Sequence, residues 1–182
     1  MKTSVTTIML LATCLVSRAD IYLFTGPIIS PQNGHAYYLL SSSKWTEAEA
    51  MAVSMGGHLA TIRDAQEDAW VFSTFTNYAD RMWIGLSDAQ VEGTFVWSSG
   101  DTNTYCNWAL GEPNNLGGVP GEDYVLYYPA SHADSGKWND TTDTDLANGV
   151  VEVVPEPSTL ALLGIGASFI TAVARRRASK RG

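Results

Sequence analysis

Side chains that could bind a cation concentrate between Gly111 and Asp140, in two clusters separated by an apolar segment, 124–128, that predicts a strand. The acids and amides of the two clusters are Glu112, Asn114, Asn115, Glu122, Asp123, Asn139 and Asp140. Carboxylate and amide oxygens are the ligands that Ca²⁺ takes, about six to eight of them per ion. Histidine and cysteine do not cluster in this stretch, so zinc, copper and iron are poor candidates. The pattern therefore predicts a calcium site built from loops.

The charge of the chain is unevenly distributed. All nineteen acidic residues lie between Asp20 and Pro157, where only four of the eleven basic residues are found. The other basic residues lie in the two terminal segments. So acidic a central part repels nucleic acid and anionic membranes, and it attracts cations. We therefore expect no nucleic-acid partner.

The first nineteen residues have the pattern of a secretory signal peptide. Lys2 is followed by an apolar run, 5–16, and then by small residues that suit cleavage before Asp20. A membrane-spanning helix is the alternative, but the run falls short of the ~20 residues that a bilayer requires. We expect a signal peptide at 1–19, export of the chain, and an N-terminal extension at 20–35.

Cysteine is scarce in this exported chain. Cys14 would leave with the signal peptide, which leaves Cys106 as the one remaining cysteine. A single cysteine cannot form an intramolecular disulfide. We expect a partly buried thiol at Cys106, with pairing to a second molecule as the alternative.

The C-terminal segment, 155–182, has three parts: Pro155-Glu156-Pro157, an uncharged apolar run at 158–174, and an arginine cluster at 175–177. The run is at the lower limit for a helix that crosses a hydrocarbon core of ~30 Å, and its arginines should stay cytoplasmic. The order resembles the PEP-CTERM sorting signal of exopolysaccharide-producing Gram-negative bacteria. The resemblance implies transient anchoring in the inner membrane and processing by an exosortase. A permanent single-span anchor is the alternative.

The periodicity of the central part predicts an α+β domain. The predicted strands are 35–40, 82–86, 95–97 and 149–154, and the predicted helices are 45–55 and a second from about 64 to 77. The first helix repeats apolar residues at i, i+3, i+4 and i+7 and ends at Gly56. The second begins at Asp64-x-x-Glu67, which has the form of a capping box. We expect the last strand to pair with the first, and most of the chain after 97 to form loops.

Six motifs in order resemble the C-type lectin-like domain over residues 36–154. They are Trp45-x-Glu47-Ala48, 56–62, 83–86, Phe95-x-Trp97, Trp108-x-x-Gly111-Glu112-Pro113-Asn114 and Trp138-Asn139-Asp140. The resemblance implies the C-type lectin fold, an α+β structure with two helices, small antiparallel sheets and a long Ca²⁺-binding loop region. Glu112-Pro113-Asn114 with the Trp-Asn-Asp motif resembles the mannose-type subgroup.

The chain departs from this family at the disulfide positions. The family usually carries two disulfides, and the matching positions here are Ala52 with Val151 and Tyr124 with Asp143. Both members of each pair are replaced together. We expect the first pair to become an apolar contact between the first helix and the last strand. The loss of a disulfide typically costs ~2–5 kcal/mol, so we expect bound metal to contribute to stability.

The resemblance implies a principal Ca²⁺ site and a second, auxiliary Ca²⁺ site. The principal metal ligands would be Glu112, Asn114, Glu122, Asn139 and Asp140, and the auxiliary ligands Asp88, Glu92, Asn115, Glu122 and Asp123. The sugar-binding residues would be Glu112 paired with Asn114 and Glu122 paired with Asn139, each pair offering one acceptor and one donor to a sugar hydroxyl. The family's Glu-Pro bond is cis, so we expect a cis bond before Pro113. The family's galactose binders carry Gln-Pro-Asp instead.

The function that follows is Ca²⁺-dependent binding of mannose-like glycans or exopolysaccharide by an exported protein at the cell surface or in the matrix. Trp108, near the loops, is a candidate ligand contact. No nucleophile–base pair or phosphate loop is evident, so we expect no enzymatic activity. A glycosidase that uses the loop acids is one alternative. A Ca²⁺-stabilised matrix protein that binds a protein partner is the other.

Overall fold

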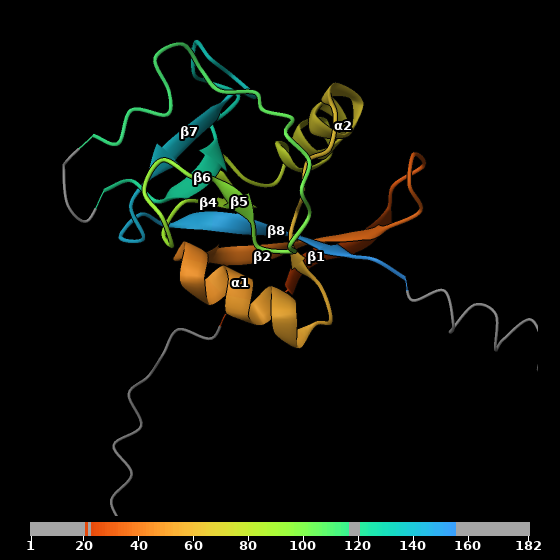
Figure 1. Ribbon diagram of the computed structural model, residues 1–182. Coiled ribbons are helices and arrows are strands. Elements are labelled where there is room, and N and C mark those ends of the chain that lie inside the picture. Colours follow the sequence, from red (N-terminus) through yellow and green to blue (C-terminus); the bar gives the residue numbers. More distant parts are fainter. Residues whose placement is uncertain (1–20, 22, 117–120, 156–182) are drawn as a thin grey trace, which may run out of the picture.

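The computed structural model describes residues 21, 23–116 and 121–155. Two helices and one mixed sheet form an α+β domain (Figure 1). In chain order the elements are β1 (Leu23–Ile29), β2 (Ala36–Ser43), α1 (Trp45–Ser54), β3 (His58–Leu59), α2 (Ala65–Phe75), β4 (Met82–Ser87), β5 (Val96–Trp97), β6 (Tyr124–Tyr127), β7 (Trp138–Thr141) and β8 (Ala147–Val153). The strand order is β1-β2-β8-β4-β6-β7, with β3 on β8 and β5 on β4.

The first and last predicted strands pair as expected. β2 and β8 are antiparallel, with Ala36 opposite Val153 and Tyr38 opposite Val151. β1, which the sequence analysis did not predict, adds to the other edge of β2. Residues 20–35, expected as an extension, therefore contribute a strand to the same sheet.

The central strands are buried on both faces. Tyr37 and Val150 belong to one apolar cluster, with the buried side of α2, whereas Leu40 and Val151 belong to a second cluster with α1. Successive residues of a strand point to opposite faces, so two adjacent valines supply both clusters. Figure 1 shows α1 and α2 on opposite sides of the β2–β8 ribbon. Burial on both faces explains why these strands have continuous apolar sequences.

Both helices form where the sequence predicts them. Asp64 caps α2 and accepts hydrogen bonds from the backbone N–H groups of Gln66 and Glu67. On α1, Ala48 and Ala52 are fully buried. Ala52 lies in the same cluster as Val151, so the expected apolar replacement of a disulfide is present.

β4 joins the two halves of the sheet. It pairs in parallel with β8 through Met82 and Trp83, and antiparallel with β5 and β6. A Cβ atom at Gly85 would lie 2.5 Å from the carbonyl oxygen of Leu59, so only glycine allows this close approach. The expected small antiparallel sheets are thus connected into one sheet by a parallel pair.

Most of the described chain after residue 97 forms loops, as expected, but it also contains a strand that was not predicted. Trp138–Thr141 forms β7, which pairs with β6 over four residues. Four residues of mixed polarity are too short for their period to predict a strand, and pairing with β6 determines their conformation.

Within the described parts of the chain, no helix is long and apolar enough to cross a membrane. The predicted signal peptide, 1–19, and apolar run, 158–174, lie outside these parts.

Candidate functional site

The site is assembled around Asp140, whose side chain points from β7 into the loop that begins at Glu112. Asp140 is only 1% exposed. Its two carboxylate oxygens accept hydrogen bonds from the backbone N–H groups of Asn114 (3.1 Å) and Asn115 (2.9 Å). One buried carboxylate therefore fixes the Glu-Pro-Asn loop to the edge of the sheet. The Glu112–Pro113 peptide bond is cis, as expected.

Glu112 presents one carboxylate oxygen without a protein partner. Its Oε1 accepts a hydrogen bond from the Tyr128 hydroxyl (3.1 Å). Its Oε2 is buried and has no hydrogen-bond partner within the described residues. Burial raises the pKa of Glu112, the Tyr128 hydrogen bond opposes that rise, and the negative charge of Asp140 adds to it. An unpaired buried carboxylate oxygen is costly unless a cation or donor reaches it.

Glu122 closes the loop from the other side. Its backbone N–H donates to Asn115 Oδ1 (2.8 Å), and its Oε2 accepts from the N–H of Leu116 (2.8 Å). Burial raises the pKa of Glu122, and the charges of Asp140 and Glu112 raise it further. The carboxylates of Glu112, Glu122 and Asp140 thus act on one another electrostatically. Residues 117–120, between Leu116 and Gly121, lie outside the described parts.

Asn139 completes the predicted principal set. Its Oδ1 accepts a hydrogen bond from the Tyr128 hydroxyl (2.8 Å), and its Nδ2 donates to the backbone oxygen of Asp140. The Tyr128 hydroxyl therefore contacts one member of each predicted sugar-binding pair. Tyr128 was not among the predicted site residues, because its place at the end of an apolar segment did not indicate a polar role.

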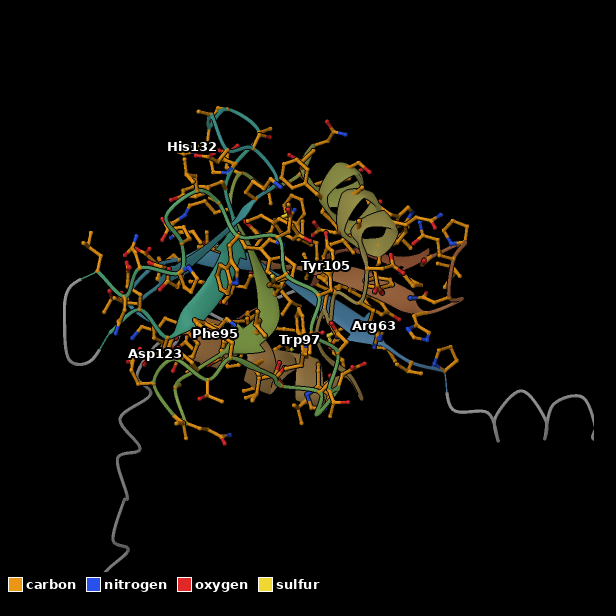
Figure 2. All side chains as sticks on the ribbon, turned by 45° about the horizontal axis from the view of Figure 1, so that its top comes forward. Arg63, Phe95, Trp97, Tyr105, Asp123 and His132 are labelled. Atoms are coloured by element: carbon orange, nitrogen blue, oxygen red, sulfur yellow. The ribbon has the colours of Figure 1, made fainter. Side chains whose placement is uncertain are left out.

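The predicted auxiliary ligands centre on Asp88. Asp88 is 2% exposed; its Oδ2 accepts from the N–H of Gly93 (2.9 Å), while its Oδ1 has no partner within the described residues. Burial raises the pKa values of Asp88 and Asp123, and Glu92 and Asp140 add to the rise at Asp88. Figure 2 shows Asp123 on the same side of the domain as Phe95, which follows the Asp88–Glu92 loop.

The donor chemistry at these residues fits a hard cation. Of three buried side-chain atoms without a partner in the described chain, two are Glu112 Oε2 and Asp88 Oδ1, and the third is the Thr76 hydroxyl. No group of three or more His, Cys, Asp or Glu side chains among the described residues is already drawn together as a metal-binding set. The principal set mixes acids with amides, and the Tyr128 hydroxyl and backbone N–H groups donate to several of its oxygens.

Asp68 on α2 is a buried carboxylate that hydrogen-bonds to residues next to the site. It accepts hydrogen bonds from Tyr127 (2.6 Å), Trp138 (3.0 Å) and Tyr105 (3.1 Å), and from the Asn107 amide. Burial raises the pKa of Asp68, and these four donors oppose the rise. Trp138 directly precedes Asn139 and Asp140, so Asp68 positions the strand that carries both. Tyr105 is half-buried and packs edge-to-face on Trp138 in the same region.

Two expectations near the loops concern Trp108 and Cys106. Trp108 is half-buried and packs edge-to-face on Phe95 and Trp138, so part of its indole supports the core beneath the loops. The partly buried thiol predicted at Cys106 is wrong, because this side chain is exposed. Its neighbours Tyr105 and Asn107 point inward to Asp68, which turns the intervening residue outward.

The two helices and the mixed sheet define the class of C-type lectin folds. A family profile described as "Lectin C-type domain" matches residues 41–151, and one described as "PEP-CTERM protein-sorting motif" matches residues 153–177. The chain belongs to the C-type lectin domain family and carries a PEP-CTERM motif at its end.

Relatives of this chain include larger receptors and isolated lectin domains. The low affinity immunoglobulin epsilon Fc receptor of Mus musculus is 38% identical over 104 residues, 57% of this chain and 29% of the receptor. C-type lectin CEL-I from Cucumaria echinata has a TM-score of 0.60 and 28% identity, covering 67% of this chain and 91% of CEL-I. The cow CD23 carbohydrate-recognition domain, solved in the presence of GlcNAc2Man3 oligosaccharide, has a TM-score of 0.56 and 31% identity, covering 67% and 89%. The similarity thus spans under a third of the mouse receptor.

Proposed function

We propose that this protein binds carbohydrate through Ca²⁺ held by Glu112, Asn114, Glu122, Asn139 and Asp140. C-type lectin domains generally bind Ca²⁺ and carbohydrate without enzymatic activity, and homologous lectins support carbohydrate binding here. The observation that carries the proposal is Glu112 Oε2, a buried carboxylate oxygen near Asp140 that has no hydrogen-bond partner among the described residues. A bound Ca²⁺ would supply the missing positive charge and open coordination positions for two neighbouring sugar hydroxyls.

We further infer a preference for mannose-like sugars: mannose, fucose, glucose or N-acetylglucosamine rather than galactose. Glu112 offers acceptors and Asn114 offers a donor in a fixed order on either side of Pro113. A sugar hydroxyl with the opposite orientation would leave one of these groups unpaired, which costs ~1–3 kcal/mol. The structure of the cow CD23 domain, determined in the presence of GlcNAc2Man3 oligosaccharide, is consistent with this preference.

Competition on immobilised mannan tests this function. In excess Ca²⁺, mannose should release the bound protein, galactose should not, and EDTA should release it completely. The double substitution Glu112→Gln with Asn114→Asp keeps one carboxylate and one amide while reversing their order. It should shift the relative affinity toward galactose by about ten- to hundredfold, because ~1.4 kcal/mol corresponds to tenfold. Equal competition by galactose and mannose against the unmodified protein would disprove the mannose-type assignment.

We propose that the tail directs processing after export and that the domain acts at the cell surface or in the exopolysaccharide matrix. The match at 153–177 begins where β8 ends, so the domain is complete when the motif starts. Mass spectrometry of the exported protein should show that residues 175–182 have been removed. A variant with Pro155→Ala, Glu156→Ala and Pro157→Ala should keep them. Recovery of the unmodified protein with its arginine cluster attached would contradict processing.

A further inference from the structure

The connection between β6 and β7 forms a fixed platform beside the candidate sugar site. Tyr128 N–H donates to Lys137 O (2.8 Å) and Gly136 N–H to Tyr128 O (3.2 Å), which close the connection at its base. Inside it, His132 N–H donates to Pro129 O and Ser135 N–H to His132 O. These turns give residues 129–136 a defined backbone, so a ligand contact here would require little ordering on binding.

The platform is also held from the domain interior. Asn107 donates to the carbonyl oxygen of Gly136 (3.1 Å) and to the buried carboxylate of Asp68. Gly136 has a φ of 74°, and a Cβ atom there would lie 3.1 Å from the ring of Phe72. The base of the connection is therefore packed directly against α2, and its position relative to β7 is set by the core.

His132 lies on this platform as an exposed aromatic ring. It stacks on Tyr128 with ring centroids 4.1 Å apart and an interplanar angle of 7°. Its Nδ1 accepts a hydrogen bond from the N–H of Asp134 (3.1 Å), which fixes the ring about its axis. The imidazole side chain remains 43% exposed. Figure 2 shows His132 on the outer loop, away from Tyr105.

Tyr128 connects this ring to the proposed sugar site. Its hydroxyl lies 3.1 Å from Glu112 Oε1 and 2.8 Å from Asn139 Oδ1, one residue from each acceptor–donor pair. A sugar held by those pairs would lie at one end of the tyrosine, with the stacked imidazole above the ring of the same tyrosine. The platform and the principal site are therefore parts of one continuous surface.

We propose that His132, stacked on Tyr128, forms a subsite for the second sugar residue of an oligosaccharide whose first residue occupies the proposed Ca²⁺ site. This inference rests on the proposed function. An aromatic face carries partial negative charge, so it attracts the C–H face of a sugar ring. Ser131 is exposed and Asp134 half-buried beside it, and they offer polar groups to the hydroxyls on the ring's edge.

A sugar fits this surface better than a peptide does. The exposed aromatic area is one imidazole, which matches one sugar ring and is far smaller than the apolar patches that bind protein partners. The neighbours Ser131, Asp134 and Ser135 are polar, and continuity with the Glu112 and Asn139 pairs supplies the ligand's first residue. The ligand class is thus an oligosaccharide with a mannose-like end, recognised through two linked residues.

Calorimetry with mannose, methyl mannoside and mannobioses of several linkages tests the subsite on the exported protein in excess Ca²⁺. At least one mannobiose should bind about two- to tenfold more tightly than methyl mannoside, the range expected for one aromatic contact. His132→Ala should abolish this difference and leave methyl mannoside affinity unchanged. His132→Phe, which keeps a flat ring, should restore it. Ala130→Ser, an exposed position in the same loop to which no ligand contact is assigned, is the matched control and should change neither affinity.

The outcomes separate the subsite from the principal site. If no mannobiose exceeds methyl mannoside, or if His132→Ala weakens both sugars equally, the subsite is wrong while the principal site stands. If His132→Phe fails to restore a preference that His132→Ala abolishes, the imidazole acts through its nitrogens and the stacking proposal is wrong. If no sugar binds the unmodified protein in Ca²⁺, the proposed function fails and the subsite fails with it.

Discussion

Two groups of carboxylates lie on opposite sides of this domain, and they differ in what compensates their negative charge. Figure 2 shows Arg63 on one side and Asp123 on the other. The Arg63 cluster consists of Arg63, Glu67, Asp101 and Glu152. The loop cluster consists of Asp88, Glu112, Glu122, Asp123 and Asp140.

In the Arg63 cluster the protein supplies the cation. The guanidinium donates to Glu152 (2.8 Å), Asp101 (3.0 Å) and Glu67 (3.1 Å). Tyr37 adds its hydroxyl to both Glu67 and Glu152. Burial alone would lower the pKa of Arg63, but the surrounding carboxylates outweigh burial and raise it. Each buried acid here has a positively charged partner.

In the loop cluster no described lysine or arginine pairs with the five acids. Backbone amides and the Tyr128 hydroxyl are the donors, and two carboxylate oxygens are left without any. Burial raises the pKa of Asp88, Glu112, Glu122 and Asp123. A carboxylate cluster that the protein neutralises with its own arginine therefore stabilises the fold. An acidic cluster without a lysine or arginine partner is instead suited to binding a cation from solution.

The largest effect is expected from removing the internal cation. Arg63→Ala would leave Glu67 and Glu152, each 5% exposed, as buried carboxylates without the guanidinium charge, with His35 still beside Glu152. Breaking a buried pair in this way costs ~3–5 kcal/mol. Urea denaturation should show that loss as a lower midpoint with an unchanged slope. Arg63→Lys is the control and should lose less stability than Arg63→Ala, because lysine keeps the positive charge. Some loss remains, because lysine cannot make all the hydrogen bonds of the guanidinium group. A loss below ~1 kcal/mol for Arg63→Ala would show that the cluster is not neutralised internally.

A second effect is expected from adding an external cation to the loop cluster. At a Ca²⁺ concentration one hundred times the Kd, the free energy of unfolding should rise by ~2.7 kcal/mol, and the melting temperature by several degrees. Asp140→Asn should remove most of the shift, since Asp140 lies at the centre of the cluster. Ser131→Ala, outside both clusters, should keep it. An identical melting temperature in Ca²⁺ and in EDTA would refute the metal-site proposal.

The smallest effect is expected at Asp145, an acid that has its own cation at the surface. A hydrogen bond from Arg81 (2.7 Å) lowers the pKa of Asp145, and a hydrogen bond from the Thr141 hydroxyl lowers it further. Burial acts in the opposite direction and raises it. The folded-state pKa lies below the unfolded value of ~3.9, so the contribution is present above that pH and is lost as the pH falls through the folded-state pKa. Because both side chains are more than a third exposed, the contribution should be under ~1 kcal/mol.

Asp145→Asn should remove that contribution in thermal melts between pH 2 and 6. At pH 6 the variant should be slightly less stable than the unmodified protein, and at pH 2 the two should coincide. Asp134→Asn, half-buried in the connection between β6 and β7, is a control outside this pair. A constant difference between the two proteins across the whole pH range would contradict the assigned pKa shift.

The main elements of the fold could be predicted because their signals are local. Apolar spacing within α1 and the Asp64 cap of α2 act over a few residues, and both helices form where they were expected. Continuous apolar runs likewise predicted β2, β4 and β8. β1 and β7 were missed, since their sequences are weakly patterned and pairing with β2 and β6 determines them.

By itself the sequence determined which groups are available for chemistry. The acids and amides of the two loop segments indicated a hard cation, and the resemblance to the C-type lectin-like domain implied the candidate ligand set. Motif order over most of the domain was sufficient to name the family. These properties depend on residue type and spacing alone, so they are independent of how far apart the chain's segments lie after folding.

Only the tertiary structure decided how these groups are held and what they lack. Asp140 fixes a loop that lies 25 residues earlier, Tyr128 contacts both sugar-binding pairs, and Asp68 on α2 anchors β7 through Trp138. Folding also leaves Glu112 Oε2 without a partner among the described residues and turns Cys106 toward solvent. The physical reason is that desolvation and hydrogen bonding depend on distance in space, and residues far apart in sequence set both.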